Sequence, residues 1–128
     1  MTAAPILRDL ADWQAAGWLR PLDVALVRFL HEADAAAPAD LLLAAALLSR
    51  LEAAGHSALP LDDPAGTAAE CLDWPAEALN ALSAALADHP LRPAAWGGCA
   101  VVEVDPPDAT GGSPLVLGAG RLALRRHW

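Results

Sequence analysis

The stretch that decides the fold is Leu41-Leu42-Leu43-Ala44-Ala45-Ala46-Leu47-Leu48, a run that no polar side chain interrupts. Ala and Leu are strong helix formers, and polarity returns only from Ser49 onward. A helix that is apolar on every face is buried by its neighbours. We therefore expect a helix that starts at Pro38, ends at Gly55 and lies at the centre of a helical domain.

Amphipathic helices are predicted before this central one. Residues 6, 10 and 13 are apolar at helical spacing, and a second helix begins at Pro21. The stripe of this second helix that we expect to face the core consists of Leu22, Leu26, Phe29, Leu30 and Ala33. Asp23 lies mainly off that stripe, in the first turn, where a negative charge favours the helix dipole.

Two further helices and a hairpin are predicted after it. Thr67 and Glu70 form a capping-box pattern that opens a short helix, and apolar residues from Leu79 to Leu86 predict another. Residues 100–104 read as a strand, and 114–125 as a hairpin with a glycine turn. The fold class is therefore mainly α: a small bundle of four to five helices followed by a short C-terminal β-hairpin.

The last strand of this hairpin has no obvious partner in the sequence. A lone hairpin is marginally stable in water, and natural proteins protect exposed strand edges. We therefore expect residues 1–128 to be a single domain of a longer protein, in which the next domain follows Trp128.

The composition excludes several classes of enzyme. The eight basic residues are all Arg, and a phosphate-binding loop of the G-x-x-x-x-G-K-[ST] type needs a Lys, as does Schiff-base chemistry. The net charge of −8 disfavours tight binding of nucleic acid, which rests on neutralisation of phosphates by cations. No apolar run approaches the ~20 residues of a membrane span, so we expect a cytoplasmic protein without a membrane partner.

No catalytic or metal-binding motif is complete. Ser57 follows His56, but the G-x-S-x-G elbow lacks its last glycine and its preceding strand. A small hydrolase built on Ser57 with His56 or His89 is the alternative from a different class. The four His residues show no i, i+4 pairing. We predict no catalytic residue, no metal and no bound cofactor in this segment.

Tryptophan and arginine supply the candidate interface residues. In a chain built mainly of Ala and Leu, the five Trp residues are either core anchors or interface hot spots. Trp13 fits a core stripe, whereas Trp96 and Trp128 occupy loop and end positions. Together with the C-terminal arginines, the candidate interface residues are Trp96, Arg121, Arg125, Arg126 and Trp128.

Three stretches in order resemble the RecD family, the alpha subunit of bacterial exodeoxyribonuclease V. Residues 19–26 resemble its opening helix, and residues 43–49 with Gly55-His56 and Leu59-Pro60-Leu61 resemble its Ala/Leu helix running into a G-H-x-x-L-x-L strand. Residues 114–117 and 120–128 resemble the hairpin that precedes the motor domains. The sequence departs from the family pattern at Ala123, where an aromatic residue is expected, and at Ser57-Ala58.

The resemblance implies a non-catalytic N-terminal docking domain of an ATP-dependent 5′–3′ DNA helicase subunit. In that family the motor, with its ATP and Mg²⁺, lies further along the chain. The domain is expected to dock on the RecC-like gamma subunit, in a complex that also holds a RecB-like beta subunit and acts in double-strand break repair and recombination. DNA would be bound through the complex, and this domain itself is not expected to bind DNA tightly. A free-standing acidic helical adaptor protein is the alternative.

Overall fold

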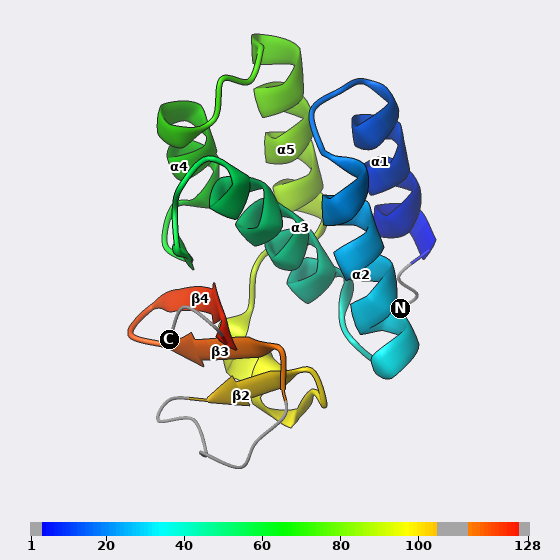
Figure 1. Ribbon diagram of the computed structural model, residues 1–128, viewed down its shortest axis with the longest axis vertical. Coiled ribbons are helices and arrows are strands. Elements are labelled where there is room, and N and C mark those ends of the chain that lie inside the picture. Colours follow the sequence, from blue (N-terminus) through cyan, green and yellow to red (C-terminus); the bar gives the residue numbers. More distant parts are fainter. Residues whose placement is uncertain (1–3, 105–112, 126–128) are drawn as a thin grey trace.

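Helices α1 to α5 lie on one side of a small β-sheet in the computed structural model, which describes residues 4–104 and 113–125 (Figure 1). The helices are α1 (Ala4–Ala15), α2 (Pro21–Ala33), α3 (Ala39–Ala53), α4 (Pro64–Cys71), α5 (Ala76–Asp88) and the 3₁₀ helix η1 (Pro93–Gly98). The strands are β1 (Ala58–Pro60), β2 (Val102–Val104), β3 (Leu115–Gly118) and β4 (Arg121–Leu124). The predicted mainly α fold is confirmed.

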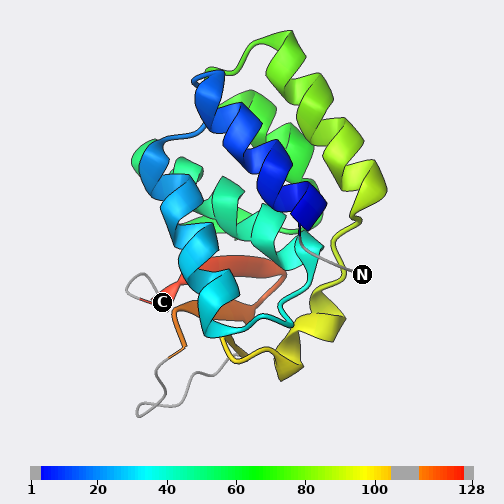
Figure 2. The same ribbon diagram turned by 90° about the vertical axis from the view of Figure 1, so that its right-hand side faces the viewer.

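Helix α3 is the centre of the fold, as its composition predicts. Every residue from Leu41 to Leu48 is buried, and α3 contacts α1, α2, α4, β1 and β4. Figure 2 shows α1 and α2 in front of it. The helix ends where Gly55 adopts a φ of +97°, a left-handed conformation that costs glycine little.

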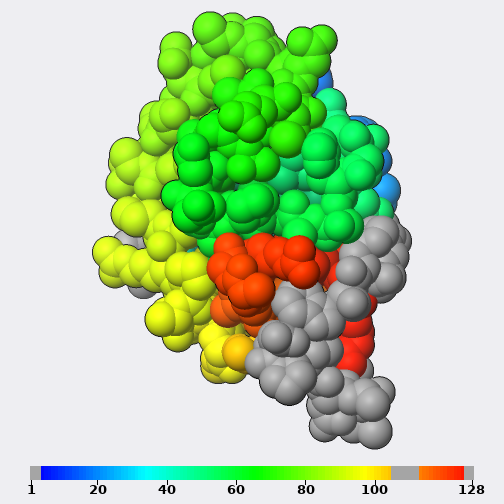
Figure 3. Space-filling model, turned by 90° about the vertical axis from the view of Figure 1, so that its left-hand side faces the viewer, coloured from blue at the N-terminus to red at the C-terminus, as the bar shows by residue number. Residues whose placement is uncertain are grey.

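The sheet has the strand order β1-β4-β3-β2. Strands β3 and β4 form the predicted hairpin, with Leu117 opposite Leu122. The expectation that the last strand lacks a partner was wrong, because β4 also pairs antiparallel with β1, placing Leu59 opposite Leu122. On the other side, β3 pairs in parallel with β2. Figure 3 shows the green segment that comprises β1 and α4 lying against the orange end of the hairpin.

The buried face of α2 differs from the prediction. Its buried residues are Asp23, Val24, Val27 and Leu30, whereas Leu22 and Phe29 are 63% and 56% exposed. The physical reason is a set of hydrogen bonds to the Asp23 carboxylate from the Arg20 backbone N–H (2.7 Å), the Arg20 guanidinium (2.7 Å) and the Ser49 hydroxyl (2.6 Å). A carboxylate with this many donors can be buried.

Helix α4 begins earlier than its capping-box pattern predicts. Its N-cap is Asp63, whose side chain accepts a hydrogen bond from the Gly66 N–H at 3.0 Å. The Thr67 hydroxyl instead donates to the Asp63 carbonyl oxygen at 2.9 Å. Helix α4 therefore begins at the pair Asp63-Pro64, in which Asp63 is the N-cap and Pro64 lies in the first turn.

Three tryptophans join the first helices to the loop between α4 and α5. The ring of Trp13 lies 6.5 Å from that of Trp18 and 6.3 Å from that of Trp74, the second pair edge to face. The Trp74 indole N–H also donates to the Trp18 carbonyl oxygen at 3.1 Å. The prediction that Trp13 is a core residue is confirmed, since only 6% of it is exposed.

Within the described ranges, no helix is both long and apolar enough to cross a membrane.

Candidate functional site

Trp96 lies inside the fold and not on a surface. Its side chain is fully buried, and its indole N–H donates to Asp40 Oδ2 at 2.9 Å. The same oxygen accepts a hydrogen bond from the Arg92 backbone N–H at 2.9 Å. Asp40 thus ties η1 to the first turn of α3. The expectation that Trp96 contacts a partner is corrected by its burial: it is a core anchor, the other role that its sequence context allows.

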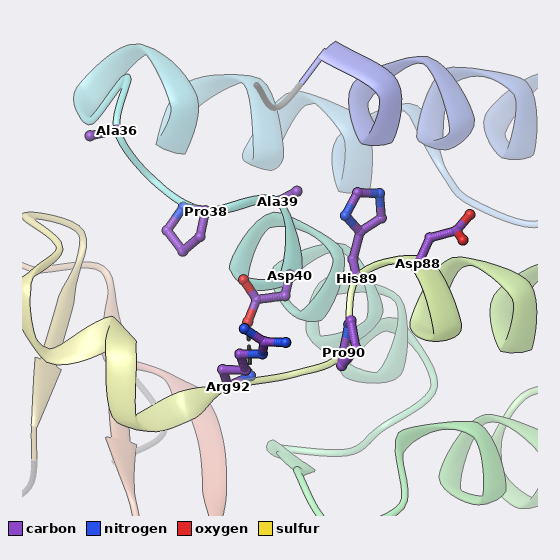
Figure 4. Close-up of a pocket in the computed structure, with 8 residues that line it drawn as sticks. All are labelled: Ala36, Pro38, Ala39, Asp40, Asp88, His89, Pro90 and Arg92. Atoms are coloured by element: carbon purple, nitrogen blue, oxygen red, sulfur yellow. Dashed lines mark hydrogen bonds between the residues drawn. The ribbon is translucent and has the colours of Figure 1, made fainter. Parts of the chain in front are cut away.

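A hollow of about 250 Å³ lies beside this anchor, between the start of α3 and the segment that follows α5 (Figure 4). Asp40, Asp88, His89 and Arg92 are its polar lining. The Asp88 carboxylate points away from the His89 ring (Figure 4), and Asp40 already accepts two hydrogen bonds. Among the residues that line the hollow, the structure therefore shows no carboxylate paired with the His89 ring.

Cys99 lies close to the carboxylates of Asp34 and Asp40, a proximity that its sequence position did not indicate. Burial raises the pKa of its thiol, and the negative charges of Asp34 and Asp40 raise it further. A thiol with a raised pKa stays protonated at neutral pH, and the thiolate is the reactive form. Cys99 is therefore poorly suited to be a nucleophile.

The predicted arginine cluster is only partly within the described residues. Arg121 is exposed on β4, whereas Arg125 forms an ion pair with Glu103 of β2 at 2.9 Å. The Arg125 guanidinium thus binds the end of the hairpin to the outer strand of its own sheet. Arg126 and Trp128 lie outside the described residues. The structure therefore does not bring the described candidates together: Trp96 is internal, and Arg125 bridges two strands.

The remaining sequence motifs form no reactive centre. His56 and Ser57 are exposed and precede β1 instead of following a strand. In the part of the chain that the structure describes, no group of three or more His, Cys, Asp or Glu side chains could hold a metal ion. His31 Nδ1 is buried without a hydrogen-bond partner among the described residues.

The surface feature that sequence reasoning missed is the outer face of α2. Leu22 and Phe29 are the most exposed large apolar residues of the described chain. Beside them is an open groove of about 350 Å³, lined by Gln14 of α1 and by residues of α2 that include Arg28, Phe29 and Glu32. The apolar stripe itself was visible in the sequence, but the prediction assigned it to the core.

These features define a mainly α domain in which helices α1 to α5 pack on a small four-stranded sheet. The family model described as RecBCD enzyme subunit RecD, N-terminal domain, matches residues 15–122. Because the match covers most of the chain, the chain belongs to this family. Comparison with the curated proteins found no match. The family resemblance inferred from the sequence is confirmed.

Proposed function

We propose that this chain is the non-catalytic docking domain of a RecD-like, ATP-dependent 5′–3′ DNA helicase subunit. Its role is to hold the motor on the RecC-like gamma subunit of an exodeoxyribonuclease V complex, which also contains a RecB-like beta subunit. The complex works in the cytoplasm, in double-strand break repair and recombination. The observation that carries the proposal is the family match over residues 15–122.

The chemistry of the chain supports a role without catalysis. With no Lys in the sequence, the domain lacks the side chain with which a Walker loop reaches nucleotide phosphates. ATP and Mg²⁺ are assigned to the motor of the parent subunit. The net charge of −8 opposes the phosphate backbone, so DNA is bound through other parts of the complex.

The packing of the domain supports a role in docking. One hydrophobic core runs through α1 to α5 and into the sheet, and β1 closes the edge of the hairpin. A surface held by such a core loses little conformational freedom on binding. The domain can therefore present a fixed shape to a partner subunit.

The decisive experiment compares the parent subunit with a variant from which this domain is deleted. We expect the full subunit to co-purify with the RecC-like subunit and the deleted one to lose it, while ATP hydrolysis on single-stranded DNA by the motor persists. The 128-residue chain alone should hydrolyse no ATP above a blank without protein and bind DNA no more tightly than micromolar at low salt. Retention of the complex after the deletion would contradict docking, and ATP turnover by the chain would contradict its non-catalytic role.

A further inference from the structure

The segment between α5 and β2 has few buried side chains. We call residues 90–100 the strap; they include η1, and Figure 2 shows them in yellow, running from the end of α5 to the sheet. Within the strap, all of which the structure describes, Trp96 is the only buried residue. A segment with one buried side chain gains little from the hydrophobic effect, so polar contacts hold much of it in place.

Two carboxylates at the corner between α2 and α3 supply these polar contacts. Asp40, in the first turn of α3, accepts hydrogen bonds from the Arg92 backbone N–H and the Trp96 indole N–H, both at 2.9 Å. Asp34, the C-cap of α2, accepts one from the Ala100 backbone N–H at 3.0 Å. Among the described residues, no other hydrogen bond joins the strap to the helices.

These contacts are poorly shielded from water. The bonds that Arg92 and Ala100 donate lie at the exposed surface, and the hollow of about 250 Å³ lies between the first strap residues and the start of α3 (Figure 4). Residues 41–48 of α3, by contrast, are all buried in one core. Segments with few buried apolar contacts and exposed backbone hydrogen bonds open at a lower free energy than the core around them.

We propose that the strap opens as one unit while α1 to α5 stay folded, with Trp96 as its plug and the carboxylates of Asp34 and Asp40 as its two catches. Asp40 binds the start of η1 and its tryptophan, and Asp34 binds the residue that leads into β2. Opening withdraws the indole from the core and uncovers the first turn of α3. The strap is therefore a conformational device that controls access to this part of the helical layer. The inference goes beyond the proposed function and does not depend on it.

Hydrogen exchange of the folded chain, followed by NMR, tests this proposal. When reclosing is faster than exchange, the exchange rate of an amide follows the opening equilibrium of its segment. We expect the strap amides that donate hydrogen bonds, those of Arg92, Ala95, Cys99 and Ala100, to share one degree of protection, below that of residues 42–48. Equal protection in the two regions, or unrelated values within the strap, overturns the proposal.

Two variants separate opening of the strap from unfolding of the whole domain. Ser49→Ala removes a bond between α2 and α3 that the open strap leaves intact. It should raise the exchange rate of residues 42–48 at least about fivefold and leave that of the strap unchanged. Asp40→Ala removes a catch that is lost in both events, so it should raise both rates at least about tenfold.

The matched control is Asp88→Ala. Asp88 is an exposed carboxylate that lines the same hollow, so its removal should leave the exchange rate of the strap unchanged. If Ser49→Ala accelerates exchange in the strap as much as in α3, the strap opens only when the domain unfolds, and the proposal is overturned. An unchanged rate in the strap of Asp40→Ala, or an equal rise in Asp88→Ala, overturns the role of Asp40 as a catch.

Discussion

The hydroxyl of Ser49 on α3 donates a hydrogen bond of 2.6 Å to the fully buried carboxylate of Asp23 on α2. Arg20 donates to the same carboxylate through its backbone and its guanidinium, and the guanidinium also reaches the Ser49 carbonyl oxygen at 3.0 Å. This contact sets which face of α2 is turned inward. It therefore also sets which face, that of Leu22 and Phe29, is left outside.

Replacing Ser49 by Ala removes one donor from a carboxylate that has no access to water. We expect the free energy of unfolding to fall by about 1–3 kcal/mol, the cost of leaving a buried acceptor short of a partner. Ser83 on α5 is exposed, so Ser83→Ala is the matched control and should change stability by less than about 0.5 kcal/mol. Urea unfolding followed by circular dichroism measures both, and equal stabilities would show that the Asp23–Ser49 bond contributes little.

Trp96 provides a test that separates a core anchor from an interface residue. Trp96→Phe keeps an aromatic ring but loses the hydrogen bond to Asp40, and we expect a loss of about 1–3 kcal/mol in unfolding free energy. Trp96→Ala should cost about 3–5 kcal/mol, as large-to-small changes in a core do. A Trp96→Ala protein of normal stability but weakened partner binding would refute the assignment to the core.

Gly55 tests the end of the central helix. A Cβ at position 55 would meet no atom within 4 Å, so only the backbone φ of +97° opposes a side chain. Gly55→Ala is expected to lower the unfolding free energy by about 1 kcal/mol, the penalty for a left-handed Ala. Gly98 also has open space around it but no positive φ, so Gly98→Ala should have the smaller effect. The melting temperatures of the two variants measure this difference, and equal values would contradict the assignment of the loss to the left-handed backbone at position 55.

Cys99 provides a pH-dependent prediction. Because burial and the charges of Asp34 and Asp40 raise the pKa of its thiol, its alkylation rate should begin to rise only above the pH at which an ordinary thiol ionises. Asp34→Asn removes one of the negative charges and should shift that rise to lower pH. The measurement is the iodoacetamide reaction of a protein whose other cysteine has been changed by Cys71→Ser. The folded pKa exceeds the unfolded one, so the contribution of this group to stability is complete at neutral pH and declines as the pH rises toward the folded pKa. An unshifted alkylation profile would contradict this assignment.

Local sequence signals were enough for helices α1 to α5 and for the hairpin, but not for η1 or for long-range partners. The run from Leu41 to Leu48 is apolar on every face, so its burial needs no knowledge of its neighbours. The inward face of α2 depends on a bond from Asp23 to a hydroxyl 26 residues away, which no periodicity reveals. For the same reason the sequence did not predict that β1, with three residues, would cover β4. The family resemblance was readable because its three stretches keep their order along the chain.

The candidate interface was harder to predict than the fold. Trp96 stands in a Pro- and Gly-rich segment that suggested a surface loop, yet Asp40 draws its indole into the core. Arg125 looked like one of a free basic cluster, but Glu103 on a strand 22 residues earlier binds it. Both outcomes depend on contacts between segments far apart in the sequence. The exposure of Leu22 and Phe29 on α2 has the same kind of cause, because the contact between Asp23 and Ser49 sets which face of that helix is turned inward.

The measurement that tests the account most directly is binding of the purified 128-residue chain to the purified RecC-like subunit in the absence of the motor. Titration calorimetry should give a saturable complex with one chain per RecC-like subunit. No heat of binding at micromolar concentrations, under conditions in which the full parent subunit binds, would contradict the claim that this domain docks the helicase subunit.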